Sequence, residues 1–437
     1  MNKNILFLSY ELNKNAQRGI YQFSKSLVDA IVSNDIKISL FTQAYLEKES
    51  EISLQNIYNS LNDPKDYFLK DNHFFKILKF YGLNLFNNHD FSLIENESNL
   101  ISSDNFFKNF NFFINKPVFY YKNNIDLLFF KAFYEKNFVL PQFSKEDIIF
   151  TSSPLAIKSS KHRVVQTVHD LIPLEHKDQF TRYFRKRIES CSHANKILCV
   201  SEYSKRQYLE YFPAMDGKVE VVYQPLPADE QTIYLSSLPD VQQAVLDKYN
   251  LKSKQYMYYV GAIEERKNIH SLIKAYTIAT NSDKSCPLVI SGSVDGGYSK
   301  NYNLNEYLVS YTDFDKVSHN IMKTDFVSDI EKLVLLRNSR AFLFPSLSEG
   351  FGIPVIEAQT LGVPVMTSNN TSLPEVTNGS ALLLENPLDI DAMVEGIKNL
   401  WSDNHYCSSL ILLGNHNSLR FTKEKFKDAI GQFLEKV

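Results

Sequence analysis

The apolar residues of this 437-residue chain gather in short runs, and longer amphipathic stretches separate the runs. Residues 5–9 form the first run, and a helix is predicted after it because Ile20, Phe23, Leu27 and Ile31 recur at helical spacing. Further strands are predicted at residues 37–42, 148–151, 163–168, 196–200 and 219–222. Strands that alternate with helices are typical of a parallel α/β sheet.

The same alternation begins again after a proline-bearing stretch at residues 224–228, which we interpret as a connector between domains. Further strands are predicted at residues 256–260, 288–291, 321–324, 341–344, 365–367 and 381–384. Further helices are predicted at residues 269–280, 328–338, 353–360 and 389–401. Two α/β halves predict a ligand site between the domains, because clefts between domains are favoured binding places.

Residues 46–144 follow neither half of this pattern. Within them, thirteen of the 40 residues from 101 to 140 are Phe or Tyr, and seven are Asn. Because aromatic side chains are usually buried, the first interpretation is an irregular insertion that packs its own small core on the first domain. The alternative is an exposed apolar surface that binds an acceptor or a membrane.

The composition is that of a folded protein, with 44% hydrophobic residues, 22% charged residues and a formal net charge of −3. So balanced a charge argues against a nucleic-acid partner. The four cysteines form no CxxC pair, which argues against a disulfide scaffold or a zinc site. The first apolar run is too short for a signal peptide, and no run approaches the ~18 residues that a membrane helix needs. We therefore expect a cytoplasmic protein, and peripheral contact with the inner face of a membrane stays open.

The densest chemical motif is the stretch 344–358, in which a strand leads through a glycine-rich turn into a helix. Pro354 suits the first helical turn, so the amides before it face outward at the positive end of the helix dipole, where they attract anions or sugar oxygens. Glu349 in the turn and Glu357 inside the helix can face one crevice beyond the strand. The alternative is structural: Glu349 caps the helix and Glu357 is a solvated charge.

This stretch resembles the E-x7-E signature of retaining glycosyltransferase family four, with its EGFGxP core intact. Residues 325–329 before it and residues 362–365 and 372–376 after it are similar to the same family. The resemblance implies an α/β GT-B fold, in which two Rossmann-like doubly wound domains face a central cleft and the later domain holds a sugar nucleotide. It also implies that Glu357 accepts hydrogen bonds from the ribose and that Glu349 contacts the transferred sugar. The other implied sugar contacts are the backbone amides of Gly350, Phe351 and Gly352.

A second motif, residues 259–268, places Arg266 and Lys267 directly before a predicted helix. Fixed cations there would stabilise the charge of a departing nucleoside diphosphate. The alternative is an ordinary basic helix start, although cations are disfavoured at helix N-termini. The region resembles the family's diphosphate loop, with Lys267 in the place of its phosphate lysine. Many members carry Arg where this chain has Ala262, so we expect Arg266 to supply the second cation.

Two motifs near the start of the chain supply the remaining expected contacts. Residues 164–174 place His169 and Asp170 after a strand, where such a pair is either a loop cap or a catalytic group. The stretch resembles the family's HDLxP motif, which implies that His169 contacts the donor sugar and that Asp170 orients it. Residues 18–20 resemble the family's early glycine loop, which implies that the backbone of Gly19 meets the diphosphate.

Competing motifs for metals and nucleotides are weaker. Asp313 with Asp315, and Asp389 with Asp391, form DxD triplets like those that hold manganese in glycosyltransferases of another fold, but neither follows an early nucleotide-binding strand. Residues 292–297 are glycine-rich but lack the Gly-Lys-Ser/Thr of a P-loop. We expect no metal site and no cofactor, with the sugar nucleotide acting as co-substrate.

The resemblance covers about residues 1–45 and 145–437, and it implies three parts. Residues 1–228 form an acceptor-side domain, interrupted by the insertion at about 46–144. Residues 229–415 form the donor domain, and residues 416–437 form a terminal helix that crosses back to the first domain.

The expected function is that of a retaining, metal-independent hexosyltransferase of polysaccharide biosynthesis, such as that of lipopolysaccharide. The resemblance is strongest to mannosyl- and rhamnosyltransferases, so GDP-mannose is the first donor to consider and a glycan or lipid-linked glycan is the acceptor. The implied catalytic set is His169, Glu349, Lys267 and Arg266, which would act by electrostatics and positioning. A sugar-nucleotide epimerase on the same fold and a non-catalytic sugar-nucleotide-binding protein are the alternatives.

Overall fold

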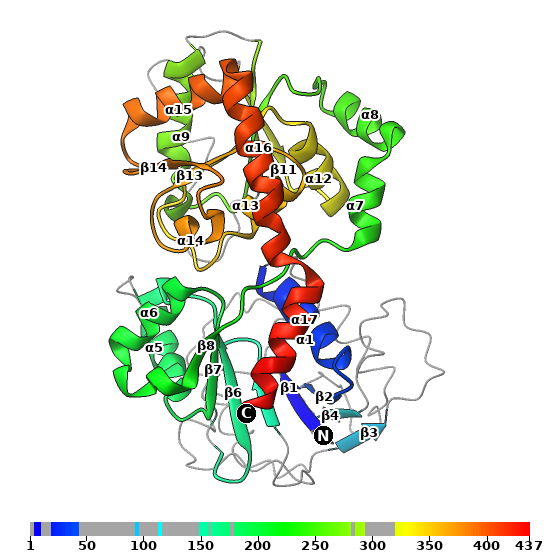
Figure 1. Cartoon of the computed structure of the whole chain (residues 1–437), viewed down its shortest axis with the longest axis vertical. Helices are drawn as coiled ribbons and strands as arrows, with labels where there is room; N and C mark the ends of the chain where they lie inside the picture. Colours follow the sequence, from blue (N-terminus) through cyan, green and yellow to red (C-terminus); the bar gives the residue numbers. More distant parts are fainter. Residues whose placement is uncertain are drawn as a thin grey trace, which may run out of the picture. The chain divides into compact units, whose positions relative to one another are not determined.

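A computed structural model describes residues 4–9, 19–42, 92–95, 112–115, 148–155, 157, 159–174, 179–280, 285–292 and 320–437. The chain divides into two compact units (Figure 1). The first unit comprises Met1–Pro225 and Lys423–Val437, and the second comprises Leu226–Thr422. The boundary at Pro225 falls inside the predicted connector. The Phe- and Asn-rich insertion lies outside the described residues, apart from two short strands.

The first unit is built on one mainly parallel sheet. Its described strands are β1 (Asn4–Leu8), β2 (Lys37–Thr42), β3 (Ser92–Glu95), β4 (Phe112–Asn115), β5 (Ile148–Thr151), β6 (Arg163–Val168), β7 (Lys196–Cys199) and β8 (Val219–Val221). They lie in the order β3-β4-β2-β1-β5-β6-β7-β8, and only β3 is antiparallel to its neighbour. The strand order reverses between β1 and β5. In sheets of this kind, ligands bind beyond the carboxyl ends of the strands at such a reversal.

Helices from both ends of the chain cover this sheet. They are α1 (Gly19–Val32), α5 (Gln179–Cys191), α6 (Glu202–Tyr211) and α17 (Lys423–Glu435), with short 3-10 turns η4 (Ile172–Leu174) and η5 (Pro213–Lys218). The last helix, α17, lies alongside α1 (Figure 1). The rings of Phe23 and Phe426 are 6.0 Å apart, and the Asn34 side chain donates to the carbonyl of Lys427 at 3.0 Å. The chain therefore returns to its first unit at Lys423.

The second unit holds a parallel sheet of short strands. They are β9 (Met257–Val260), β10 (Leu288–Ser291), β11 (Ile321–Asp325), β12 (Ala341–Phe344), β13 (Val365–Ser368) and β14 (Leu382–Leu384). The inner strands β10, β12 and β13 are wholly buried. Among the described residues their order is β11-β10-β9-β12-β13-β14. The order reverses between β9 and β12, so the favoured ligand crevice lies beyond the carboxyl ends of these two strands.

Two helices of the second unit precede its first strand, and the others follow strands of the sheet. The helices are α7 (Glu230–Ser237), α8 (Pro239–Lys248), α9 (Ile269–Thr280), α12 (Asp329–Asn338), α13 (Ile353–Thr360), α14 (Leu373–Thr377), α15 (Ile390–Ser402) and α16 (Asn404–Ser418), with 3-10 turns η6 (Glu265–Lys267) and η8 (Leu419–Phe421). Ser328 begins α12 with a reciprocal capping box to Glu331, and the Asp389 side chain caps α15. The central strands β9, β10 and β12 are rich in apolar residues, as expected for a parallel sheet that helices cover on both faces.

The expected fold class is confirmed: both units are doubly wound α/β sheets. Each strand and each helix for which a residue range was predicted is present with ends that agree within one residue, except the terminal helix predicted at residues 416–437. Residues 416–418 end α16, the turn η8 follows, and the last helix begins at Lys423. Within the described part of the chain, no helix is long and apolar enough to cross a membrane.

Candidate functional site

A group of buried charges lies at the strand-order reversal of the second sheet. The loop after β9 leads into η6, which carries Arg266 and Lys267, and the loop after β12 carries Glu349. The two loops are joined by the amide of Leu347, which donates to the carbonyl of Arg266 at 2.8 Å. Two motifs about 80 residues apart in the sequence therefore form one site.

Lys267 and Glu349 form a buried ion pair. The Nζ of Lys267 lies 2.5 Å from Oε1 of Glu349, and each side chain is about a tenth exposed (11% and 10%). The same Nζ lies 4.9 Å from the ring centroid of Phe344, the last residue of β12. Asn268, which follows Lys267, has a φ of 56° and ends the 3-10 turn before α9 begins. The turn thus holds the ammonium over the end of β12 rather than in solvent.

Arg266 completes a network of two cations and two carboxylates. Its Nη1 lies 3.3 Å from Oε2 of Glu349, and its Nη2 lies 2.5 Å from Oε1 of Glu264. Its Nη1 also donates to the carbonyl of Ser348 at 2.7 Å. Because the four charges cancel, the site can stay buried without a bound ligand, and an incoming anion has to compete with Glu349 and Glu264 for the cations.

The protonation of Glu349 is set by these neighbours. Burial by itself raises the pKa of this carboxyl, but the charges of Lys267 and Arg266 outweigh burial and lower it below the usual range. Ser346 adds a hydrogen bond from its hydroxyl to Oε1 of Glu349 at 2.7 Å. Glu349 is therefore a carboxylate at neutral pH and not a proton donor.

The loop that follows β13 holds the backbone of Glu349 in place. The amide of Glu349 donates to Oγ1 of Thr371 at 3.2 Å, and the hydroxyl of Ser372 donates to the carbonyls of Glu349 and Phe351. Thr371 has a φ of 53°, a left-handed conformation that is costly for a β-branched residue. Gly352 precedes α13 with a φ of 102°, and a Cβ there would lie 2.8 Å from Leu373. The turn therefore requires glycine at this position.

Gly350 and Phe351 complete the turn between Glu349 and Gly352. Gly350 links Glu349 to Phe351. The side chain of Phe351 is buried, with its ring 5.6 Å from that of Phe421 in an edge-to-face contact. This packing agrees with a prediction that concerns the backbone amides of the turn and not the Phe351 ring, and the sugar contact itself stays a prediction.

Glu357 lies in α13 as predicted, and it has a partner that the sequence motifs do not reveal. Its Oε1 lies 2.7 Å from Nζ of Lys332, which comes from α12. The same Nζ lies 3.6 Å from Oδ1 of Asp329. Burial lowers the pKa of Lys332, but the Glu357 and Asp329 carboxylates outweigh it and raise the pKa, so the ammonium stays charged. Glu357 is only 2% exposed, and the ion pair with Lys332 holds its buried carboxylate in place.

In the first unit, His169 follows β6 and is buried. Its Nε2 lies 2.8 Å from the carbonyl oxygen of Ser152, and its ring meets that of Phe23 edge-on at 4.7 Å. Burial lowers the pKa of His169 to about 4, although the bond with Ser152 raises it. The ring is therefore neutral at pH 7. Because a carbonyl can only accept, Nε2 carries the hydrogen and Nδ1 is left as an acceptor.

Asp170 directly follows this histidine, and Gly19 begins the helix α1. Oδ1 of Asp170 accepts from the amide of Ile172 at 3.1 Å, which caps the η4 turn. The carbonyl of Ser152 holds the His169 ring at Nε2, and the orienting role of Asp170 stays a prediction. Gly19 is the exposed first residue of α1.

The metal motifs find no support among the residues that the structure describes, where no group of three His, Cys, Asp or Glu side chains could hold an ion. Asp389 is the N-cap of α15 and Asp391 lies in its first turn, so both residues of this DxD triplet stabilise the start of a helix. Asp313 and Asp315 lie outside the described residues.

The structure thus brings Arg266, Lys267 and Glu349 into contact and places Glu357 beside Lys332. The sequence motifs missed the partners that hold these groups. They are Glu264, Lys332, Ser346, Thr371 and Ser372. A polar side chain near a motif is a weak signal, because only the folded chain shows which such residue meets the site.

Comparison with known proteins gives two family matches. The family described as glycosyl transferases group 1 matches residues 242–412, and the one described as glycosyltransferase family 4 matches residues 108–230. The chain is 31% identical over 267 residues to O-antigen chain mannosyltransferase B of Escherichia coli, with 60% of this chain and 67% of that protein covered. It is 28% identical over 275 residues to O-antigen chain mannosyltransferase RfbU of Salmonella typhimurium, with 61% and 68% covered.

The structure is similar to that of sucrose-phosphate synthase from Thermosynechococcus elongatus. The TM-score is 0.65 at 16% sequence identity, and the match covers 99% of this chain and 98% of that one. Because the sequence identity is so low, this match supports the fold and nothing further.

Proposed function

This chain belongs to glycosyltransferase family 4, and we propose that it transfers a hexosyl group, mannose first among the candidates, from a nucleoside-diphosphate sugar to a glycan or lipid-linked glycan acceptor. The transfer retains the configuration at the anomeric carbon and needs no metal ion. The sugar nucleotide is a co-substrate, so no resident cofactor takes part.

The observation that carries this proposal is the pair of cations at the strand-order reversal of the second sheet. Lys267 and Arg266 converge on Glu349 within 3.3 Å, in a place where α/β sheets bind ligands. A nucleoside diphosphate would replace Glu349 as the partner of these cations. Arg suits bidentate contact with phosphate oxygens, and Lys supplies a compact point charge.

The chemistry follows from where charge develops. When the bond from the anomeric carbon to the diphosphate oxygen breaks, its electrons leave with the diphosphate, and Lys267 and Arg266 stabilise that charge. The acceptor hydroxyl attacks the same face of the sugar, and its proton passes to the departing phosphate oxygen. The Glu349 carboxylate, displaced from the cations by the diphosphate, then interacts with the sugar hydroxyls and with the positive charge that develops on the sugar ring. Glu357 accepts from the ribose hydroxyls.

His169 supplies a neutral acceptor rather than a general acid. With its hydrogen on Nε2 and directed to Ser152, its Nδ1 can accept a hydrogen bond from a sugar hydroxyl. Its low pKa keeps this state over the whole physiological range.

Mannose is proposed because two relatives are named as O-antigen chain mannosyltransferases. Those names also support a polysaccharide acceptor. Peripheral contact with a membrane remains part of the proposal, since a lipid-linked acceptor would bring the protein there.

The test is thermal unfolding with GDP, UDP, dTDP and ADP, each with EDTA and with manganese, followed by a transfer assay with the donor that binds. A ligand at ~100 times its dissociation constant should add about 2.7 kcal/mol of stability. We expect a shift that survives EDTA. A shift that requires manganese, or none with any diphosphate, would contradict the proposal. A donor sugar that changes without acceptor would identify an epimerase, and binding without turnover a non-catalytic protein.

A further inference from the structure

We propose that Lys254, Arg337 and Arg340 form a second anion site, which binds a phosphate group at the amino ends of the strands β9 and β12. We call these three residues the cation cluster. Lys254 comes shortly before β9, and Arg340 comes directly before β12, which pairs with β9. Lys267 and Glu349 follow the carboxyl ends of the same two strands. The cation cluster is therefore separate from the site already described, and the inference does not depend on the proposed function.

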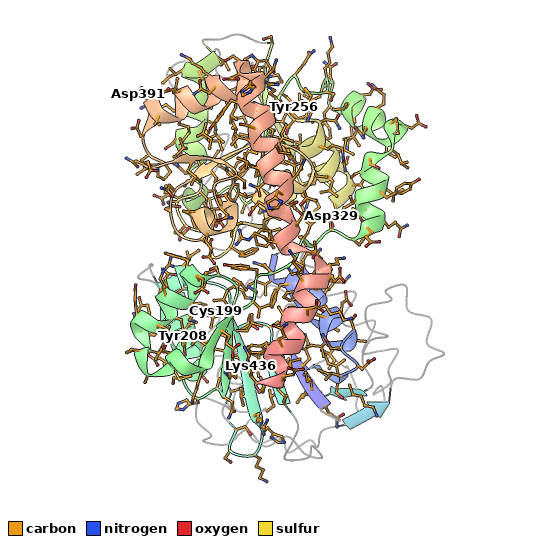
Figure 2. All side chains as sticks on the ribbon, viewed as in Figure 1. Cys199, Tyr208, Tyr256, Asp329, Asp391 and Lys436 are labelled. Atoms are coloured by element: carbon orange, nitrogen blue, oxygen red, sulfur yellow. The ribbon has the colours of Figure 1, made fainter. Side chains whose placement is uncertain are left out.

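Backbone hydrogen bonds hold the turn before β9 against the end of α12. The amide of Lys254 donates to the carbonyl of Asn338 at 2.7 Å, and the amide of Arg340 donates to the carbonyl of Tyr256 at 2.7 Å. Lys254 has a φ of 60°, a left-handed conformation that is uncommon for lysine. Figure 2 shows Tyr256 and Asp329, the first residue of α12, well apart in the second unit. The cation cluster thus lies far from the start of this helix.

Part of the cation cluster stabilises helix ends. The Nζ of Lys254 donates to the carbonyls of Arg337 at 2.7 Å and Ser339 at 3.0 Å, where α12 ends. The Nε of Arg340 donates to the carbonyl of Leu400 in the last turn of α15 at 2.9 Å. Cations are favoured at helix C-termini, so these bonds have a structural explanation. They use the ammonium of Lys254 and one nitrogen of Arg340.

The rest of the cation cluster has no such explanation. The Nε of Arg337 and the Nη2 of Arg340 are buried and have no hydrogen-bond partner among the residues that the structure describes. Within the same residues, no carboxylate forms an ion pair with Arg337, Arg340 or Lys254. Buried donors without an acceptor are rare, because they lose their hydrogen bonds to water. The two arginines therefore offer both charge and free N–H groups to a ligand.

The three charges also repel one another. Partial burial, together with the charges of Arg340 and Arg337, lowers the pKa of Lys254 to about 8. Burial lowers the pKa of Arg337 as well. Lys254 is nevertheless exposed, and both arginines are partly exposed, so a ligand can reach them. A bound anion would relieve this repulsion.

A phosphate group suits the cation cluster better than a carboxylate does. It carries about −1.5 to −2 charges at pH 7, whereas a carboxylate brings one charge to three cations. Its oxygens can accept from several side chains at once. Arginine binds phosphate with two parallel hydrogen bonds, and lysine adds a compact point charge.

The test measures the unfolding midpoint against inorganic phosphate, at an ionic strength held constant with chloride. The main variant is Arg337→Gln, because the Arg337 side chain makes no hydrogen bond to the described residues. We expect phosphate to raise the wild-type midpoint and its apparent dissociation constant to increase about tenfold in the variant. Without phosphate, Arg337→Gln should be at least as stable as the wild type, since one repelling charge is gone. A purely structural role of Arg337 would instead lower the midpoint of the variant with and without phosphate alike.

Two controls assign the phosphate effect to a place. Phosphate can also bind at η6, so the double variant Lys267→Met with Glu349→Gln is measured and should keep the stabilisation. Lys274→Gln, a change at an exposed position of α9, should bind phosphate as the wild type does. If the double variant loses the stabilisation while Arg337→Gln keeps it, the anion binds at η6 and the inference is overturned. Failure of every nucleoside diphosphate to bind would overturn the proposed function and leave this inference standing.

A phosphate group can also belong to a lipid headgroup, and a second measurement separates the two sources. Vesicles of phosphatidylglycerol are sedimented with the protein, and vesicles of phosphatidylcholine serve as the control. Stabilisation by free phosphate that Arg337→Gln weakens supports a soluble phosphate. Binding to phosphatidylglycerol alone that Arg337→Gln weakens supports a headgroup. If neither free phosphate nor phosphatidylglycerol distinguishes Arg337→Gln from the wild type, the cation cluster binds no phosphate group and the inference fails.

Discussion

The two units present different chemistry at the same place in their sheets. Beyond the strand-order reversal of the second sheet lie Lys267, Arg266 and Glu349, all charged and tightly paired. Near the corresponding edge of the first sheet lie His169, held neutral, and the buried Ser152. One doubly wound fold thus offers a charged edge in the second unit and a neutral polar edge in the first.

This difference in charge indicates which part of a substrate each edge is suited to bind. A diphosphate needs compensating cations, and Lys267 and Arg266 supply them at the charged edge. Sugar hydroxyls need neutral acceptors and donors, which buried His and Ser side chains supply without the desolvation cost of a charge.

The strongest test of the charged edge is Lys267→Met. We expect the transfer rate to fall about 10³-fold, because the leaving diphosphate loses a fixed cation. Binding of the diphosphate should fall much less. A steady-state assay paired with titration calorimetry measures both.

The same variant leaves Glu349 buried without its main partner, which costs about 3–5 kcal/mol of stability. The double variant Lys267→Met with Glu349→Gln should recover most of that stability and none of the activity. Turnover by the single variant within tenfold of the wild type would show that this edge does not stabilise the leaving group.

The neutral edge is tested by pH. The pKa of His169 is about 4 in the folded chain, against about 6.5 when exposed, so between these values the unfolded chain binds the extra proton. This residue's contribution to stability is therefore lost as the pH falls from 6.5 to 4, by about 3 kcal/mol in all. Above pH 6.5 it has no effect.

His169→Gln should flatten the fall of the unfolding midpoint over that range, whereas His405→Gln, a change at an exposed position of α16, should not. Equal pH dependence in the wild type and His169→Gln would mean that the ring is charged in the folded chain.

A smaller effect is expected from Glu357→Gln. The variant loses a charged acceptor for the ribose, and hydrogen bonds to charged groups contribute about 1.5–3 kcal/mol. The donor KM should therefore rise about 10- to 100-fold with a lesser change in kcat. Glu395→Gln, an exposed position on α15, is the control. A fall in kcat at constant KM would contradict a role of Glu357 in donor binding and would indicate a role in the chemical step.

The smallest effect concerns the loop that holds Glu349. Thr371→Ala removes the hydroxyl that accepts from the Glu349 amide at 3.2 Å, and the transfer rate should fall about threefold to tenfold. Thr371→Ser keeps the hydroxyl and should stay within twofold of the wild type. If both variants behave alike, the hydroxyl has no part in positioning Glu349.

Most of the architecture was predictable from the sequence, because its signals are local. Short apolar runs such as 341–344 are too short for a helix and so favour buried strands, and a helix start such as Ser328 is marked by its own capping box. The motifs that hold Lys267, Glu349 and Glu357 were also visible, since their residues are close together in the chain. Their expected roles were implied by the family resemblance and not by these local signals.

The tertiary structure alone decided which residues meet. The pairing of Lys267 with Glu349 spans 82 positions, and Lys332 reaches Glu357 across 25. The neutral state of His169 depends on burial beneath Phe23 and on the carbonyl of Ser152. Local sequence sets which groups a strand or a loop carries, but distance, burial and charge compensation are properties of the packed chain, and these fix what each group can do.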